Sequence, residues 1–149
     1  MRISFDPKDV PDSSQLFDLT NENYTTGSPW SVNGFEEDLK SVHAHYGMVL
    51  LEQKCIGFIG YHNVFGEAEI TNFVVAKKFQ RQGIASQLLQ CCLEKWCVEK
   101  VEQVFLEVRE SNQSAIQLYK KMGFITIGTR KQYYKQPIEN ALIMQLTLS

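Results

Sequence analysis

The sequence predicts a mixed α/β fold, in which helices pack on a central sheet. Two kinds of segment support this prediction. Short apolar or alternating runs bounded by turn residues are typical of strands, and apolar residues at every third or fourth position are typical of amphipathic helices. They follow one another as strand, two helices, three strands, helix, strand, helix and two strands, an order that suits a mixed sheet with flanking helices.

The first half of the chain is predicted to supply four strands and two helices. Residues 2–5 alternate as a short strand does, and residues 11–24 form a polar segment with scattered apolar residues that suits a short helix. After the break at residues 27–29, Ser31 is a good N-cap for a second helix with apolar residues on neighbouring turns. Three strands are then expected, at residues 46–52, 55–63 and 66–76.

The second half contains the clearest helical pattern of the chain. Apolar residues recur at every fourth position from Ile84 to Trp96 and predict a helix with one buried face. A strand is expected at residues 101–109, followed by a short helix that is capped by Ser111 or Asn112 and ended by Gly123. The last two strands are predicted at residues 124–131 and 141–148, linked by residues 133–137.

Composition and length indicate a small globular protein. The chain has 149 residues, a formal net charge of -2 and 44% hydrophobic residues, which fits one domain over residues 1–149 with a full core. The near-neutral charge argues against a broad nucleic-acid surface. The sequence shows neither a signal peptide nor an apolar run of about 20 residues, so we expect a cytoplasmic protein without a membrane segment.

The cysteines and histidines are not expected to bind a metal. Cys55, Cys91, Cys92 and Cys97 lack the paired spacing of a zinc site, so we interpret them as reduced thiols in or near the core. The three histidines show no ligand spacing either.

The most informative stretch is the turn at residues 80–85, because an apolar run leads into it and the amphipathic helix leads out. The first N–H groups of a helix lack intrahelical partners and carry about half a positive charge, so phosphate oxygens can bind there. Gly83 lets the chain approach closely, and Arg81 adds a cation. One glycine alone is weak evidence. The turn lacks both the Gly-Lys-Ser/Thr of a P-loop and the Gly-x-Gly of a dinucleotide site.

Two motifs together resemble those of a known family. Gln80, Gly83 and Ala85 match the Gln/Arg-x-x-Gly-x-Gly/Ala turn of the GCN5-related N-acetyltransferases (GNAT). A second signature matches at Leu106-Glu107-Val108-Arg109, Ser111-Asn112, Ala115-Ile116, Leu118-Tyr119 and Gly123-Phe124. With Pro29-Trp30-Ser31 and Tyr133-Tyr134, the chain resembles the RimI-type ribosomal-protein-alanine N-acetyltransferases within that family. The resemblance implies the GNAT acyl-CoA N-acyltransferase fold and is strongest from about residue 73 to residue 134.

The resemblance also implies acetyl-CoA as co-substrate, without a metal. The backbone of Phe73, Val74 and Val75 is expected to pair with the pantetheine arm and to polarise the thioester carbonyl. The pyrophosphate is expected at the loop and helix start formed by Arg81, Gln82, Gly83, Ile84, Ala85 and Ser86. Asn112 reads as a helix cap, and its family counterpart also contacts the coenzyme, so both interpretations stay open.

Acetyl transfer to an amine needs a base for the ammonium proton and an acid for the leaving thiolate. Alternation along the strand turns Glu107 away from its apolar neighbours, which fits either a cleft or a solvated surface, and its family counterpart is the general base. A tyrosine, with an ordinary pKa near 10, suits the acid, although the helical spacing of Tyr119 equally fits a core residue. The resemblance assigns the general acid to Tyr119.

Aromatic residues in predicted loops are the candidates for acceptor binding. Trp30, Tyr133 and Tyr134 fall in such loops, where substrate contacts collect, although exposed aromatics also cover core edges. The acidic run at residues 36–38 fits a solvated helix face or, alternatively, the attraction of a basic peptide.

The leading hypothesis is an acetyl-CoA-dependent N-acetyltransferase that modifies the N-terminal alanine of a small-subunit ribosomal protein. No serine or cysteine stands in a recognisable nucleophile setting, so direct attack by the amine is preferred. A second hypothesis changes the acceptor to another protein N-terminus, a lysine or a small amine. A third is an acetyl-CoA-binding regulatory module, against which Glu107 and Tyr119 argue because a sensor needs neither.

Two positions depart from the pattern of the subgroup. Lys77-Lys78 stands where a proline commonly precedes the coenzyme loop, which leaves the loop less rigid and more basic. Asn140 stands where an acidic residue is usual, so a contact made by that charge is expected to be lost or weakened. The second departure bears on acceptor specificity.

Overall fold

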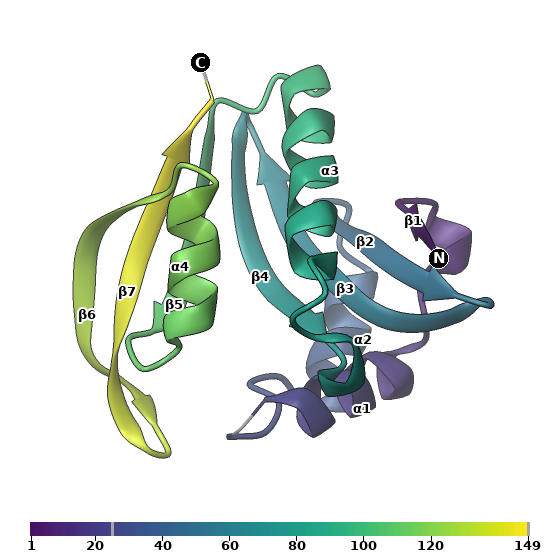
Figure 1. The fold of residues 1–149 in the computed structure, drawn as a ribbon, viewed down its shortest axis with the longest axis horizontal. Helices are drawn as coiled ribbons and strands as arrows, with labels where there is room; N and C mark the ends of the chain where they lie inside the picture. The colour runs from purple at the N-terminus through teal and green to yellow at the C-terminus, as the bar shows by residue number, and fades with distance from the viewer. Residues whose placement is uncertain (25, 149) are drawn as a thin grey trace.

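The computed structural model describes residues 1–24 and 26–148, and its helices and strands follow the predicted order (Figure 1). Within these ranges the helices are α1 (Ser13–Asn23), α2 (Val32–Leu39), α3 (Ile84–Val98) and α4 (Gln113–Lys121). The strands are β1 (Arg2–Ser4), β2 (Ala44–Leu51), β3 (Lys54–Val64), β4 (Glu67–Val75), β5 (Gln103–Arg109), β6 (Ile125–Lys135) and β7 (Ile138–Thr147). Two 3-10 helices, η1 (Pro7–Asp9) and η2 (Lys77–Phe79), were not predicted, because a single turn has no periodicity to detect.

The strands form one mixed sheet in the order β1-β2-β3-β4-β5-β7-β6. Neighbouring strands are antiparallel except β4 and β5, which are parallel and are connected through α3. The ladder between β4 and β5 joins only residues 67–69 to residues 103–105, although both strands continue beyond it. The two strands therefore separate toward their carboxyl ends (Figure 1). Residues 70–75 of β4 and 106–109 of β5 do not pair with each other, and we call the opening between them the β4–β5 fork.

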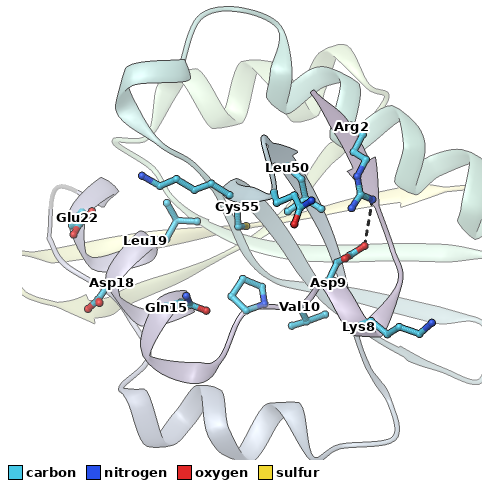
Figure 2. A pocket seen from close by; sticks show the side chains of 13 residues that line it. Arg2, Lys8, Asp9, Val10, Gln15, Asp18, Leu19, Glu22, Leu50 and Cys55 are labelled. Atoms are coloured by element: carbon cyan, nitrogen blue, oxygen red, sulfur yellow. Dashed lines mark hydrogen bonds and ion pairs between the residues drawn. The ribbon is translucent and has the colours of Figure 1, made fainter.

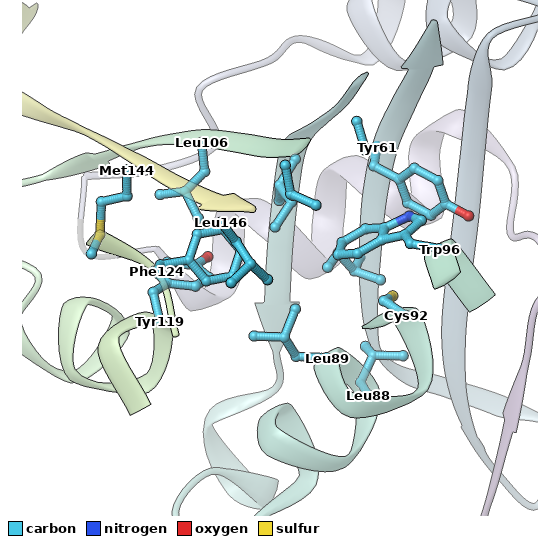
Figure 3. Close-up of a cluster of buried hydrophobic side chains, with 14 of the residues drawn as sticks. Tyr61, Leu88, Leu89, Cys92, Trp96, Leu106, Tyr119, Phe124, Met144 and Leu146 are labelled. Atoms are coloured by element: carbon cyan, nitrogen blue, oxygen red, sulfur yellow. The ribbon is translucent and has the colours of Figure 1, made fainter. Parts of the chain in front are cut away.

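Each face of the sheet buries its own apolar core. On one face α3 and α4 cover the larger core, which includes Leu88, Trp96 and Tyr119 (Figure 3). On the other face α1 and α2 cover a smaller core, to which they contribute Leu16 and Phe35. Burial of one such side chain contributes about 1.5–3 kcal/mol. Each core attaches a layer of helices to one face of the sheet. The fork, which is part of the sheet, therefore lies between the two helical layers.

Local signals set the ends of the helices nearest the fork. Asn112, rather than the serine before it, caps α4 by accepting a hydrogen bond from the N–H of Ala115 at 3.3 Å. Gly123 follows α4 with a φ of 103°, a left-handed geometry that glycine adopts without strain, and so ends this helix as predicted. Ser31 caps α2 through the N–H of Gly34 at 3.0 Å, also as predicted.

The C-terminal hairpin differs from the prediction. The expected link at residues 133–137 is wrong, because β6 continues to Lys135 and β7 starts at Ile138. β6 lies at the edge of the sheet and is exposed along nearly its whole length, so it lacks the alternation of a half-buried strand. Its pairing with β7 also shifts between Arg130 and Tyr134, a β-bulge that the sequence does not signal. The two adjacent tyrosines are therefore strand residues and not loop residues.

The four cysteines are free thiols, as expected. Cys92 is fully buried in the larger core, and burial raises the pKa of its thiol, which makes it unreactive. Cys97 is exposed, so the expected location in or near the core is wrong for this residue. The described ranges contain no group of side chains arranged to hold a metal ion. None of the helices in the same ranges has the length and apolar character needed to cross a membrane.

Asp38 corrects the interpretation of residues 36–38 as a solvated acidic face. Its side chain is only 6% exposed, whereas Glu36 and Glu37 are exposed as expected. The carboxylate accepts a hydrogen bond from the Tyr46 hydroxyl and pairs with Nε2 of His62. Asp38 therefore ties the end of α2 to β2 and β3, which a pattern of local charge cannot reveal.

Substitution of Asp38 by Ala should lower the free energy of unfolding by about 1–3 kcal/mol, because the buried Tyr46 hydroxyl and the partly exposed His62 ring lose their acceptor. Urea unfolding followed by circular dichroism measures this change. The control is Glu37→Ala on the same helix. Glu37 forms only an exposed ion pair with Lys40 at 3.6 Å, so its loss should cost no more than about 0.5 kcal/mol. Equal losses in the two variants would contradict the anchoring role of Asp38.

Candidate active site

The backbone of β4 directs two of its N–H groups into the β4–β5 fork. The N–H of Ala76 donates to the carbonyl of Ile56 at 2.8 Å, on the β3 side. Backbone groups of successive strand residues point to opposite edges, so Val74 also faces β3, whereas Phe73 and Val75 face the fork. Of the three residues predicted to bind the pantetheine arm, the outer two have the direction that such pairing requires.

The carbonyls of the same two residues are already hydrogen-bonded. The Phe73 carbonyl accepts from the Tyr24 hydroxyl at 3.4 Å, and the Val75 carbonyl accepts from Nε2 of Gln80 at 2.8 Å. Gln80 belongs to the signature turn, and this bond shows how its side chain fastens the turn to the end of β4. The strand edge thus offers donors to a ligand while its acceptors are occupied.

The turn before α3 leaves a run of donors free. Within the described part of the chain, none of the six N–H groups from Arg81 to Ser86 donates a hydrogen bond to another residue. No side chain caps α3, and the N-cap Gly83 has a φ of 79°. A Cβ atom on Gly83 would meet no atom within 4 Å, so this position borders open space. Free N–H groups at a helix start can bind phosphate oxygens, and Arg81 adds a positive charge to the same turn.

Glu107 lies on the other edge of the fork. Its neighbours Leu106 and Val108 point into the core under α3 and α4, so Glu107 projects to the opposite face, as alternation predicts. The side chain is 30% exposed and pairs with Arg130 of β6, with 3.3 Å between Oε1 and Nε. The pKa of Tyr133 is raised, mainly by the charge of Glu107 beside it. The carboxylate therefore stands beside a phenol and a cation at the fork.

Tyr119 approaches the fork from the α4 side. The residue is 6% exposed, and its ring packs with the rings of Phe73 and Phe124, at centroid distances of 6.2 and 5.4 Å. Burial raises the pKa of the Tyr119 phenol, with smaller contributions from Tyr24 and Tyr134. Tyr119 is thus a core residue and also a neighbour of the β4 edge, and it stays protonated at any ordinary pH.

The β-bulge in β6 brings both adjacent tyrosines toward β5. Successive residues of a regular strand point to opposite faces, but the rings of Tyr133 and Tyr134 contact each other at 5.2 Å and 80°. Tyr134 lies against Arg109 of β5, and Tyr133 lies against Arg130, which pairs with Glu107. The Asn140 side chain secures the bulge by accepting a hydrogen bond from the N–H of Gln132 at 2.9 Å. Asn140, predicted only as the loss of a charge, therefore has a structural contact of its own.

Two other predicted residues have clear structural partners. Trp30 packs its ring on Phe35 at 5.2 Å and so covers the edge of the smaller core, the alternative that its sequence context left open. The side-chain oxygen of Asn112 accepts the hydrogen bond that caps α4. Contacts of these two residues with a ligand stay predictions. Lys77 and Lys78 form the 3-10 turn η2 that leads into the signature loop.

A pocket of about 550 Å³ lies elsewhere, between the N-terminal segment, α1 and the β2–β3 turn (Figure 2). Its lining includes the ion pair of Arg2 and Asp9, at 3.3 Å. None of the residues predicted to bind coenzyme or acceptor lines this pocket. The fork, in contrast, brings together free N–H donors, a carboxylate and a phenol, the groups that acetyl transfer would need. We therefore take the fork, and not this pocket, as the candidate site.

Sequence reasoning did not identify three polar residues at the fork. Arg130 pairs with Glu107, Tyr24 binds the Phe73 carbonyl, and Arg109 contacts the tip of the β6–β7 hairpin. Each contact joins residues at least 20 positions apart in the sequence, so no local pattern reports it. Arg109 was quoted within a signature, and its match there is the one signal that could have drawn attention to it.

Comparison with known proteins places these features in context. Residues 13–124 match the family model described as the Acetyltransferase (GNAT) family. The chain is similar to the ribosomal protein bS18-alanine N-acetyltransferase of Haemophilus ducreyi, at 34% identity over 92% of this chain and 94% of that protein. It is 32% identical to the enzyme of the same name from Escherichia coli K12, over 81% of this chain and 82% of that one.

Solved structures show the same likeness. The ribosomal-protein-S18-alanine N-acetyltransferase from Escherichia coli matches with a TM-score of 0.88 at 28% identity, over 99% of this chain and 94% of that one. Ard1 from Thermoplasma volcanium shares the fold, with a TM-score of 0.85 at 24% identity over 99% of this chain and 97% of that one. The predicted mixed sheet with flanking helices is thereby confirmed as the fold of these proteins.

Proposed function

The chain belongs to the GNAT family of N-acetyltransferases, which use acetyl-CoA, and from this we propose that its acceptor is the N-terminal alanine of a small-subunit ribosomal protein. The observation that carries the proposal is the similarity to bS18-alanine N-acetyltransferases along nearly the whole of both chains. Residues 1–149 would act as one domain, and the expected cytoplasmic location stays part of the proposal.

Acetyl-CoA is proposed to bind along the fork and the start of α3. The pyrophosphate would accept hydrogen bonds from the N–H groups of residues 81–86, with Arg81 supplying a positive charge. The pantetheine arm would pair with β4 as an added strand, through the N–H groups of Phe73 and Val75. One of these donors would also polarise the thioester carbonyl as negative charge develops on its oxygen. The direction of these groups into the fork supports the assignment.

Glu107 is proposed as the general base. A peptide α-amino group has a pKa of about 8, so at neutral pH it arrives mostly as ammonium and must lose a proton before it can attack. The freed amine would attack the thioester carbon, forming the C–N bond. The C–S bond would then break, and the nitrogen would release its second proton to solvent to give the neutral amide. The exposed carboxylate on the acceptor face of β5 supports this role, with Trp30, Tyr133 and Tyr134 proposed as walls of the acceptor site.

Tyr119 is proposed as the general acid that protonates the leaving sulfur. Its raised pKa keeps the phenol protonated at alkaline pH, so the proton remains available where an ordinary tyrosine, near pH 10, would be half ionised. Tyr119→Phe should lower kcat about 10- to 50-fold, a moderate loss because a thiol of pKa near 8.5 also leaves as a thiolate. For the wild type, steady-state kinetics from about pH 7 to pH 10 should show no fall in kcat caused by ionisation of the Tyr119 phenol.

The control for this prediction is Tyr61→Phe. Tyr61 lies in the same core with a hydroxyl that lacks a hydrogen-bond partner in the described residues, and burial raises its pKa as well, but it packs on Trp96. Its loss should leave kcat unchanged. If Tyr119→Phe lowered the melting temperature but left kcat as in the wild type, the hydroxyl would be structural only.

The proposed acceptor is tested with acetyl-CoA and short peptides that differ in their first residue, by following free thiol and product mass. Acetylation confined to peptides that begin with Ala or Ser supports the proposal. Acetylation of lysine side chains or small amines in preference to any N-terminus would overturn the acceptor class. No turnover with any amine, despite tight binding of the coenzyme, would favour the regulatory module.

A further inference from the structure

Arg109 makes a cluster of contacts with the tip of the β6–β7 hairpin. Its Nη1 pairs with Oε1 of Glu139 at 3.1 Å and donates to the carbonyl of Pro137 at 3.3 Å. Its Nη2 reaches the carbonyl of Gln136 at 3.4 Å, and the guanidinium lies 4.1 Å from the ring centroid of Tyr134. Both charged side chains are largely buried, at 22% exposure for Arg109 and 13% for Glu139. We call this set of contacts the Arg109 clamp.

Glu139 extends the clamp to the start of α4. Its second oxygen, Oε2, accepts a hydrogen bond from the N–H of Ser111 at 2.9 Å. The hydrogen bonding at Ser111, followed by the contact with Arg109, lowers the pKa of the Glu139 carboxyl. The carboxylate therefore stays ionised, and it connects β7, β5 and the turn before α4 at one point.

The clamp secures a part of the hairpin that the sheet does not hold. The β5–β7 ladder ends at the pair Arg109 and Ala141, whereas β6 and β7 remain paired as far as Lys135 and Ile138. Residues 132–140 therefore extend beyond the last rung between β5 and β7. This overhang carries Tyr133, whose ring lies 5.3 Å from the guanidinium of Arg130, the partner of Glu107, and Tyr134, whose ring lies against Arg109 of β5. Two bonds between Glu110 and Asn140, one of the backbone at 3.2 Å and one of the side chains at 3.5 Å, join it to the turn after β5, and the Arg109 clamp adds the contacts at its tip.

We propose that Arg109 is a positioning residue for the acceptor, which acts by fixing the overhang so that its two tyrosines form a wall beside Glu107. This inference rests on the proposed acetyltransferase function of the fork. Arg109 directs both terminal nitrogens of its guanidinium to the hairpin, so its effect on the acceptor is expected to act through Tyr133 and Tyr134. The pyrophosphate loop lies between β4 and α3, away from the clamp. Asn112, the predicted coenzyme residue next to Ser111, is held by its own bond to the N–H of Ala115 and not by the Arg109 side chain. Loss of Arg109 should therefore weaken acceptor binding and leave coenzyme binding unchanged.

The test is Arg109→Met, which keeps the apolar stem and removes the guanidinium fork. KM for the acceptor peptide should rise about 10-fold, with kcat at saturating peptide and Kd for acetyl-CoA each within about 2-fold of the wild type. Arg109→Lys should restore part of the loss, because an ammonium keeps the charge but cannot make the forked contacts. Glu139→Gln should raise KM in the same direction, and the double variant should be no worse than Arg109→Met alone.

The matched control is Arg2→Met, in an Arg–carboxylate pair that is remote from the hairpin. It should change neither KM nor kcat. A fall in kcat with KM unchanged, or an equal effect of Arg2→Met, would overturn the proposal. If Arg109→Met does not fold, Arg109→Lys and Glu139→Gln decide the question, because both keep the side-chain volume nearly constant.

Hydrogen exchange separates failure of this inference from failure of the proposed function. Amides of residues 132–136 and of Ile138 should exchange about 10-fold faster in Arg109→Met than in the wild type, without any substrate, while those of α3 should not change. That result supports the clamp even if no peptide is acetylated. Unchanged exchange at the hairpin would overturn the clamp even if peptides are acetylated normally.

Discussion

Glu107→Gln should lower kcat by about 100-fold or more at pH 7 while the Kd for acetyl-CoA changes by less than about 2-fold. Gln keeps the shape of the side chain but cannot take a proton from the acceptor ammonium. The loss should shrink as the pH rises above about 8, because the peptide amine is then already neutral. Steady-state kinetics at pH 7 and pH 9.5, with coenzyme binding measured by titration calorimetry, checks each part.

The ion pair with Arg130 does not complicate this test. The side chains of Arg130 and Glu107 are 55% and 30% exposed, and a pair of this kind contributes no more than about 1 kcal/mol to stability. An arriving ammonium can therefore replace the guanidinium at low cost. Glu107→Gln should leave the melting temperature nearly unchanged, so a lost rate cannot be ascribed to unfolding.

The control variant is Glu102→Gln, an exposed glutamate just before β5 at the end away from the fork. It should leave kcat as in the wild type. Two outcomes would contradict the assignment of Glu107. An unchanged kcat would remove Glu107 from the reaction, and an equal loss at pH 7 and pH 9.5 would show that its charge matters and not its capacity to take a proton.

The order of helices and strands was predictable because burial on one face imposes a period on the sequence. The predicted strand at residues 66–76 became β4 at Glu67–Val75, and the apolar repeat from Ile84 to Trp96 became α3 at Ile84–Val98. β6 was predicted too short because burial does not impose a period on it. An edge strand exposed on both faces has no period, and its bulge depends on a side chain, Asn140, that lies on the neighbouring strand.

The candidate site, too, contains residues that the local sequence could predict and residues that it could not. The turn around Gly83 could be predicted because its chemistry is local to a few residues, and Glu107 could be placed on one face because alternation is local as well. The role of Asp38 was predicted wrongly, because its partner His62 is 24 positions away in the sequence. Arg109 was overlooked, because its partner Glu139 is 30 positions away. Charge runs and motifs describe neighbours along the chain, whereas burial and pairing are set by the assembled sheet.

Gly83→Ala should raise the Kd for acetyl-CoA by about 100-fold, which is about 2.7 kcal/mol. Two effects combine. At a φ of 79° an Ala costs about 1 kcal/mol of backbone strain, which the chain can relieve by turning the free N–H groups of residues 81–86 away from a common point. The new Cβ would also enter the open space beside the loop, where a phosphate would have to lie. Titration calorimetry with acetyl-CoA measures the affinity.

A comparison of two donors identifies the part of the coenzyme that is affected. Acetyl-pantetheine lacks the pyrophosphate, so its kcat/KM should fall less than about 3-fold in Gly83→Ala, whereas kcat/KM for acetyl-CoA should fall about as much as the affinity. The control is Gly128→Ala, at a glycine in β6 where a Cβ would make only an ordinary contact, 3.7 Å from Ile143. Equal losses with both donors would mean that the substitution distorts the fork itself, and the loop would then not be the phosphate site. A loss confined to acetyl-CoA would show that the six free N–H groups of residues 81–86 bind the pyrophosphate. The substitution misaligns these groups, whereas the N–H groups of Phe73 and Val75 on β4 keep their direction.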